Sequence, residues 1–140
     1  MRPKPITIAE IEYTAFDLAK KLMTWDAPIP DFGTRFPNIL ESCIGQPFVR
    51  FDKKDLYRGL IGKASILFYL LIKNHPFQNG NKRIAIMTTL YFFYKNGGWL
   101  RMENANLYRF AKGIATSRPH SREKTITHIQ NTFRRYLIKL

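Results

Sequence analysis

The chain has 140 residues, 45% of them hydrophobic, so we expect one domain over residues 1–140 with a single core. Its formal net charge of +13 favours a polyanionic partner: nucleic acid, nucleotide phosphate or an acidic protein. The longest mainly apolar run, Ile84 to Tyr94, is too short to cross a bilayer, so we expect no membrane-spanning segment. With no recognisable secretory signal and Cys43 as the single cysteine, we expect a cytoplasmic protein.

The first part of the chain alternates between helical patterns and breaks. Thr7 and Glu10 have the spacing of a capping box, and apolar residues follow at helical intervals, so a first helix should end near Met23. Two prolines, a glycine and two aspartates predict a surface loop over residues 26–36, and a short helix should follow over residues 38–43. Gly45-Gln46-Pro47 then breaks the helix, and alternation over residues 48–51 indicates an extended segment of the kind found in a hairpin flap.

The rest of the chain carries the clearest helical patterns. The region from Asp55 to Ile72 has a broad apolar face and should form a long helix. An apolar run between Asn81 as N-cap and Gly97 beyond the C-cap predicts a buried central helix. Two further patterns, residues 107–114 and 126–137, indicate a shorter helix and a final helix that ends the chain. We therefore predict an all-α fold with about six helices.

The segment from His75 to Arg83 carries the residues with chemical potential. Gly80 can adopt a positive φ and leave room for a ligand, Asn81 opens a helix, and Lys82 and Arg83 place two cations in its first turn. The first N–H groups of a helix lack internal partners and attract anions, so cations at this end imply a bound phosphate. His75 precedes Asn81 by six residues and can lie beside that phosphate, where its imidazole can accept a hydroxyl proton.

Simpler interpretations compete with an anion site. A His-Pro-Phe sequence is usually only a structured loop, and Gly-Asn before a helix is usually only a turn with a cap. The convergence of His, Gly, Asn, Lys and Arg at the mouth of a buried helix favours the anion site, because ordinary capping does not require it. No acidic residue lies between Asp55 and Glu103, whereas seven Lys and Arg do, so the middle of the chain should attract anions.

The sequence from His75 to Arg83, His-Pro-Phe-Gln-Asn-Gly-Asn-Lys-Arg, resembles the signature of the Fic and death-on-curing (Doc) superfamily. Residues 40–48, Tyr57 and residues 71–74 are also similar to Doc toxins, so most of residues 7–115 is covered. The resemblance implies a Fic/Doc-type helical fold, with the motif loop between two central helices. It also implies a short flap before them that docks the protein substrate.

Lys82 selects the branch of the superfamily that the resemblance implies. Fic nucleotidyltransferases carry glycine there and transfer AMP, whereas Doc toxins carry lysine and transfer the γ-phosphate of ATP to a threonine of elongation factor Tu, which arrests translation. Ile86 stands where the longer Fic signature has a second arginine, and this also favours the Doc branch. The implied protein is a toxin of a toxin–antitoxin system. AMP transfer and a catalytically silent nucleotide- or nucleic-acid-binding module are the alternatives.

The resemblance also implies roles for the motif residues. His75 would be the base that activates the target hydroxyl, with Lys82 and Arg83 as the other catalytic residues and Phe77 as the anchor of the loop. ATP would be the substrate and Mg²⁺ the cofactor. Asn79 stands where an acidic residue usually holds Mg²⁺, and an amide oxygen is a poorer ligand for a hard cation than a carboxylate. The implied nucleotide-binding residues are Asn79, Gly80, Asn81, Lys82 and Arg83.

Control of such a protein would come from outside the chain. The inhibitory Ser/Thr-x-x-x-Glu-(Gly/Asn) helix of self-inhibited Fic proteins has no match here, so the resemblance implies a small antitoxin, often with an acidic tail. The segment after Glu103 holds eight Lys and Arg against one acid, Glu123, and would suit such a tail; a solvated basic face is the simpler interpretation. We expect no membrane partner, and we favour nucleic-acid binding less than the protein partners.

Overall fold

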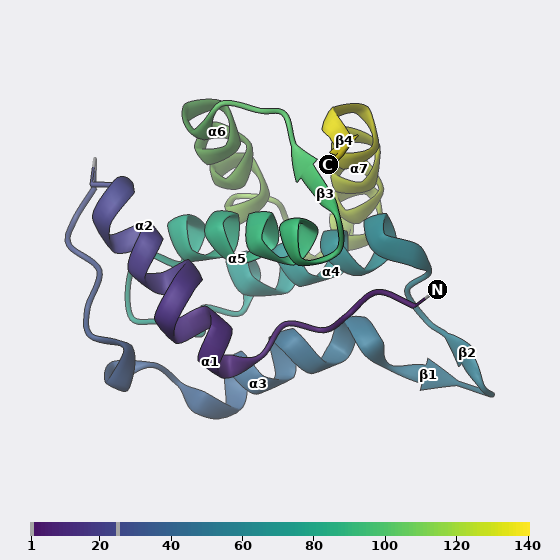
Figure 1. Cartoon of the computed structure of the whole chain (residues 1–140), viewed down its shortest axis with the longest axis horizontal. Coiled ribbons are helices and arrows are strands. Elements are labelled where there is room, and N and C mark those ends of the chain that lie inside the picture. Colours follow the sequence, from purple (N-terminus) through teal and green to yellow (C-terminus); the bar gives the residue numbers. More distant parts are fainter. Residues whose placement is uncertain (1, 25) are drawn as a thin grey trace.

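The computed structural model describes residues 2–24 and 26–140, and the chain in it is mostly helical (Figure 1). The helices are α1 (Ile8–Glu10), α2 (Asp17–Leu22), α3 (Pro37–Gly45), α4 (Gly59–Lys73), α5 (Asn81–Lys95), α6 (Asn104–Ala115) and α7 (Arg122–Tyr136). The strands are β1 (Arg50–Phe51), β2 (Lys54–Asp55), β3 (Gly98–Leu100) and β4 (Leu137–Lys139). A π-helical segment joins α1 to α2, so the described residues form six continuous helices, and the predicted all-α fold is confirmed.

The first helix begins where the capping box predicts. The Thr7 side chain accepts a hydrogen bond from the Glu10 N–H at 3.1 Å, and the Glu10 carboxylate accepts one from the Thr7 N–H at 2.9 Å. The helix ends at Leu22, next to the predicted end. The π-helical turn over Ile11–Phe16 was not predicted, because its buried residues still recur at intervals that an ordinary α-helix would also give.

Helices α4 and α5 lie side by side at the centre of the molecule (Figure 1) and are buried along almost their whole lengths. Helix α4 begins at Gly59, four residues after the predicted start at Asp55, because Asp55 belongs to β2. The predicted N-cap is also wrong by one position: α5 begins at Asn81, and Gly80 is the N-cap. Gly97 follows the C-cap with a φ of 81°, as predicted.

The remaining helices cover the central pair from two sides. Figure 1 shows α6 and α7 on one side of α4 and α5, with α1 and α3 on the other. The ring of Phe133 from α7 contacts Phe68 of α4 and Phe93 of α5, with centroids 5.4 and 5.5 Å apart, and so joins three helices. The prediction that a helix ends the chain is wrong, because the last residues form β4, which pairs antiparallel with β3.

A two-stranded hairpin occupies the position of the predicted flap. Strands β1 and β2 pair antiparallel, with Arg50 opposite Asp55, whereas Phe48 lies in a 3₁₀-helical turn before them rather than in the extended segment. Lys63 of α4 is fully buried and its ammonium group lies 3.0 Å from the Asp55 carboxylate, which anchors the hairpin to the core.

The middle of the chain is less open to anions than its composition suggests. Lys63 is paired with Asp55, and the Lys95 ammonium lies 2.8 Å from the Glu10 carboxylate. Those two cations therefore have internal partners and are less available to an external anion, whereas the expectation for the remaining cations stays a prediction. None of the helices among the described residues is both long and apolar enough to cross a membrane.

Candidate functional site

The loop between α4 and α5, residues 74–80, carries the predicted site and is anchored through its two middle residues. The carbonyl of Pro76 accepts a hydrogen bond from the N–H of Phe36 at 2.8 Å, which ties the loop to the start of α3. The Phe77 side chain is 4% exposed, and its ring centroid lies 5.8 Å from those of both Phe16 and Phe32. Phe77 therefore fixes the loop to the core, in the position that the sequence predicts.

Asn81 holds the other end of the loop. Its side-chain oxygen accepts a hydrogen bond from the Phe77 N–H at 2.9 Å, and its amide nitrogen donates to the Phe77 carbonyl at 2.8 Å. The two bonds fix the orientation of the amide group, because oxygen must face the donor and nitrogen the acceptor. Since both ends of the amide are engaged within the protein, the side chain shapes the loop in this structure and is not turned outward to a phosphate.

His75 is exposed and adopts a φ of 50°, in the left-handed region that residues other than glycine rarely occupy. Such backbone strain persists only where the surroundings hold it, and it is often found at functional sites. Its Nδ1 atom lies 3.5 Å from the Asn81 amide nitrogen, which places the imidazole close to the first residue of α5.

Gly80 has the predicted positive φ, 78°, but the space beside it is not open to a ligand. A Cβ atom at this position would lie 2.7 Å from Cγ1 of Ile29, so the side of Gly80 expected to face a nucleotide faces the core. The Gly80 N–H is also engaged, because it donates to the side-chain oxygen of Asn79 at 2.8 Å. The N–H groups that remain to attract an anion are therefore those of the first turn of α5 itself.

Asn79 does not fit a protein-held Mg²⁺ site in this structure. Its side-chain oxygen accepts the Gly80 hydrogen bond, and it carries no charge. Among residues 2–24 and 26–140, no three His, Cys, Asp or Glu side chains are grouped in a way that could hold a metal ion.

Arg83 is directed into the protein. Its side chain is 2% exposed, and its guanidinium group donates to the carbonyls of Met23 at 3.0 Å and Ala27 at 2.5 Å. These bonds tie the first turn of α5 to the loop after α2, so the guanidinium is engaged within the protein, and its contact with phosphates stays a prediction. Lys82 is only half-buried, and its side chain makes no hydrogen bond or ion pair with any of the described residues. It is the motif cation with a side chain available to a ligand.

Asp26 is a neighbour of the motif that the sequence did not reveal. Its carboxylate accepts a hydrogen bond from the Tyr108 hydroxyl of α6 at 2.6 Å and another from the Ala27 N–H at 2.8 Å. The Tyr108 bond is the main reason that the pKa of Asp26 lies below its usual value, and the charges of Arg83 and Lys82 add to the effect. Because 82 residues separate Asp26 from Tyr108, no local pattern could have indicated this contact.

The structure thus brings His75, Asn81 and Lys82 together at the N-terminus of a long buried helix and turns Arg83 away from them. The model of the Fic/DOC family matches residues 11–93, more than half of the chain, and the match includes the whole motif loop. Comparison with curated proteins and with solved structures gave no match. The length of the family match, together with the helical fold and the motif between two central helices, shows that the chain belongs to the Fic/DOC family.

Proposed function

We propose that this protein is a Doc-type toxin that transfers the γ-phosphate of ATP to a Ser or Thr hydroxyl of a translation factor and so arrests translation. Elongation factor Tu is the expected target. The observation that carries the proposal is the exposed, left-handed His75 beside the start of α5, with Lys82 next along that helix. Lysine at this position, where AMP-transferring members carry glycine, is the reason to prefer phosphate transfer.

The proposed reaction needs few groups. The hydroxyl oxygen of the target attacks the γ-phosphorus, the bond from that phosphorus to the bridging oxygen of the β-phosphate breaks, and ADP leaves. His75 accepts the hydroxyl proton. Lys82 and the N–H groups in the first turn of α5 stabilise the charge on the γ-phosphate oxygens, and positioning with charge stabilisation is most of what phosphoryl transfer requires.

Two other motif residues take positioning roles in the proposal. Arg83 holds the loop after α2 against α5 through the Met23 and Ala27 carbonyls, and Asn81 holds the backbone of the loop that carries His75. Since Asn79 offers only an engaged amide oxygen, we expect Mg²⁺ to arrive bound to the nucleotide phosphates rather than to the protein.

A catalytically silent nucleotide-binding module is the second candidate. It is favoured by the internal bonds of Arg83, which direct the guanidinium into the protein, and by the amide at Asn79, which is a poorer ligand for Mg²⁺ than a carboxylate. AMP transfer is a third outcome, which Lys82 disfavours.

Labelled nucleotide separates the three candidates. The purified protein is incubated with a cell lysate and ATP labelled at either the γ- or the α-phosphate. Movement of the γ label onto a protein supports the proposal, and movement of the α label shows AMP transfer. ATP binding with no label on any protein, measured by equilibrium dialysis, shows the silent module.

Two histidine variants test the role of the imidazole. His75→Ala should abolish both labelling and growth arrest, whereas His120→Ala, at an exposed histidine in the turn Pro119–Ser121, should leave both unchanged. Full labelling by His75→Ala would contradict the proposed mechanism.

We also expect control by a small partner protein with an acidic tail, since the motif arginine has no inhibitory glutamate within the chain. Co-expression of such a partner should relieve growth arrest, and purification of the toxin should then recover both chains. Arrest that persists beside a co-purified partner would count against this form of control.

A further inference from the structure

The hairpin and the motif loop lie at opposite ends of α4. Strands β1 and β2 come just before the first residue of α4, whereas His75 comes two residues after its last residue, Lys73. At a rise of about 1.5 Å per residue, the 15 residues of α4 span about 22 Å. Figure 1 shows the hairpin beyond one end of α4, and the segment that joins α4 to α5 leaves from the other end. The hairpin therefore does not border His75.

A hollow of about 380 Å³ borders the motif loop on the side of α3. Its described lining residues are Asn38, Ile39 and Ser42 of α3 and Asn74, which directly precedes His75. The hydrogen bond between the Phe36 N–H and the Pro76 carbonyl holds the start of α3 against the loop. Since consecutive Cα atoms are about 3.8 Å apart, a chain that occupies the hollow lies next to the residue that carries the proposed base.

The described lining residues of this hollow are uncharged, although the chain carries a net charge of +13. Asn38 and Asn74 are exposed, and each offers a carboxamide, which presents a donor and an acceptor as a peptide group does. The Asn38 side chain forms no hydrogen bond with another described residue, so both of its groups are available. The Ser42 hydroxyl accepts a hydrogen bond from the Gln46 amide at 3.1 Å and keeps its own proton to donate. The hollow therefore suits an extended main chain.

The geometry of phosphate transfer separates the nucleotide from this hollow. The attacking hydroxyl and the leaving ADP lie roughly in line on opposite sides of the γ-phosphorus. Lys82 and the N–H groups proposed to hold the phosphates belong to α5, after the loop, whereas the hollow is formed by α3 and the residue that follows α4. A nucleotide base would also lack a ring to stack on, because no aromatic residue is among the described lining residues. The hollow thus suits the target better than the nucleotide.

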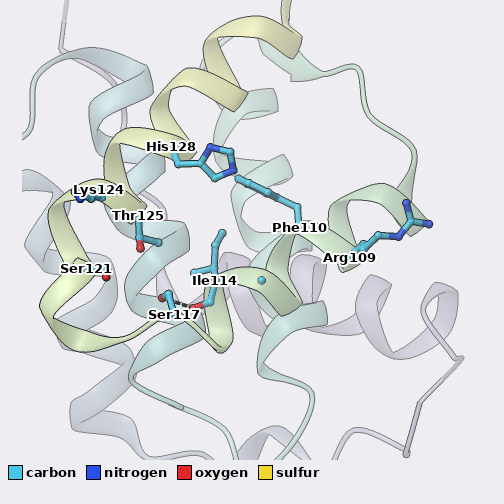
Figure 2. Close-up of a pocket in the computed structure, with 9 residues that line it drawn as sticks. Arg109, Phe110, Ile114, Ser117, Ser121, Lys124, Thr125 and His128 are labelled. Carbon is cyan, nitrogen blue, oxygen red and sulfur yellow. Dashed lines mark hydrogen bonds between the residues drawn. The ribbon is translucent and has the colours of Figure 1, made fainter.

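A larger hollow of about 530 Å³ lies between α6 and α7 and is in the wrong place for the target hydroxyl (Figure 2). None of its described lining residues belongs to the motif loop. Helices α6 and α7 also cover the central pair from the side opposite to α3 (Figure 1). Its lining includes the cations Arg109 and Lys124, so it differs in charge as well from the hollow beside His75.

We propose that the hollow formed by α3 and Asn74 binds the main chain of the target segment that carries the acceptor hydroxyl, with the amides of Asn38 and Asn74 bonded to its peptide groups. This inference rests on the proposed function, because it concerns the target of the same reaction. Ile39 is half-buried and supplies apolar surface for one side chain of that segment. Because the described lining is uncharged, the residues that flank the hydroxyl should be neutral.

The first measurement separates this inference from the proposed function. The parent protein is incubated with γ-labelled ATP and purified elongation factor Tu, and in parallel with a cell lysate. If no protein takes the label, the proposed function fails and the inference falls with it. If a protein is labelled, the proposed function holds, and that protein is purified as the substrate for the variants.

The double variant Asn38→Ala/Asn74→Ala removes both amides. It should raise KM for the target at least ~10-fold while kcat and KM for ATP stay within ~2-fold, because it removes binding that the ground state and the transition state share. Asn104→Ala is the matched control, since Asn104 is also an exposed asparagine in the first turn of a helix, and it should leave all three constants unchanged. Unchanged KM for the target in the folded double variant would overturn the proposal. A rise in KM for ATP in its place would show that the hollow binds the nucleotide, which also overturns it.

Ser42→Trp tests the hollow without removing either amide. Ser42 is exposed on α3, so the large side chain fills the hollow and the melting temperature should stay close to that of the parent protein. KM for the target should again rise at least ~10-fold. The exposed ring of Phe51 in the hairpin provides the competing site. If Phe51→Ala raised KM for the target more than Ser42→Trp did, the hairpin would be the main docking element, and the proposal would be refuted.

Discussion

Arg83→Ala tests whether the motif arginine acts mainly as a structural residue. In the parent protein its guanidinium donates to the Met23 and Ala27 carbonyls at 3.0 and 2.5 Å, from a side chain that is almost fully buried. Alanine removes both bonds and leaves the carbonyls without their donor. Met23 is fully buried, so its carbonyl is poorly placed to recover a bond from water, whereas Ala27 is exposed.

The expected loss of stability follows from these two bonds. A hydrogen bond to a charged group contributes about 1.5–3 kcal/mol to stability, and Arg83→Ala removes two of them. Water can replace the lost donor at the exposed Ala27 carbonyl, so we expect a total loss near the lower end of the range for two bonds, about 3 kcal/mol. For a chain of this length that corresponds to a fall of about 10 °C in melting temperature. Arg83→Lys keeps the charge but has only one nitrogen to donate, so it should cost about half as much.

Urea unfolding followed by circular dichroism gives the free energy of unfolding for each variant. Lys82→Ala is the matched control from the same helical turn. Its half-buried side chain has no bonded partner among the described residues, so it should alter stability by less than about 0.5 kcal/mol. If Arg83→Ala kept its stability within that margin while losing ATP binding, Arg83 would be a phosphate ligand and the structural interpretation would be wrong.

Three further changes test the loop and the flap. Gly80→Ala should lower the free energy of unfolding, measured by urea unfolding, by about 2 kcal/mol. The reason is that φ is 78° and a Cβ atom would lie 2.7 Å from Ile29. An unchanged free energy of unfolding would mean that the loop is not constrained there. Phe77→Ala should cost about 3 kcal/mol and speed hydrogen exchange in the loop, and unchanged exchange would refute its anchoring role. The hydrogen bond from Lys63 holds the pKa of Asp55 below its usual 3.8, so the carboxylate stabilises the fold above that pH and its contribution is lost as pH falls through the lower folded pKa. Asp55→Asn should therefore show a smaller fall in the free energy of unfolding between neutral and strongly acidic pH. An equal fall in both proteins would show that this carboxylate does not cause it.

The parts of the fold that depend on local chemistry were predictable from the sequence. The capping box at Thr7 and Glu10 and the glycine after α5 act within a few residues, and both are where the pattern places them. The start of α4 was not predictable in this way. Asp55 belongs to β2 instead, where it lies opposite Arg50 in the hairpin and its carboxylate forms an ion pair with Lys63. The pairing of β4 with β3 joins segments almost 40 residues apart, and no local pattern encodes it.

The candidate site shows the same division between local and distant information. Gly80 has the positive φ and Phe77 the core position that their residue types suggested, whereas nothing in the sequence indicated the positive φ of His75. The partners of Arg83 could not be predicted, because they are backbone carbonyls, which any residue carries, about 60 residues earlier in the chain. Lys63 was misjudged for a related reason: composition counts a lysine as a surface charge unless a specific acidic partner is known.

The surroundings of α5 explain why a strongly basic family member need not expose all the cations of its motif. The loop after α2 supplies two carbonyls to Arg83, and Asp26 on the same loop is bound to Tyr108 of α6. One short segment therefore links the first helix, the motif helix and α6, and it places an ionised carboxylate close enough to Lys82 and Arg83 to interact with both charges. The Asp26 carboxylate is thus a negative charge near the start of α5, and it would oppose the attraction of a second anion to that helix terminus. Under the proposed function, the strength of nucleotide binding would therefore depend on this loop as well as on the motif.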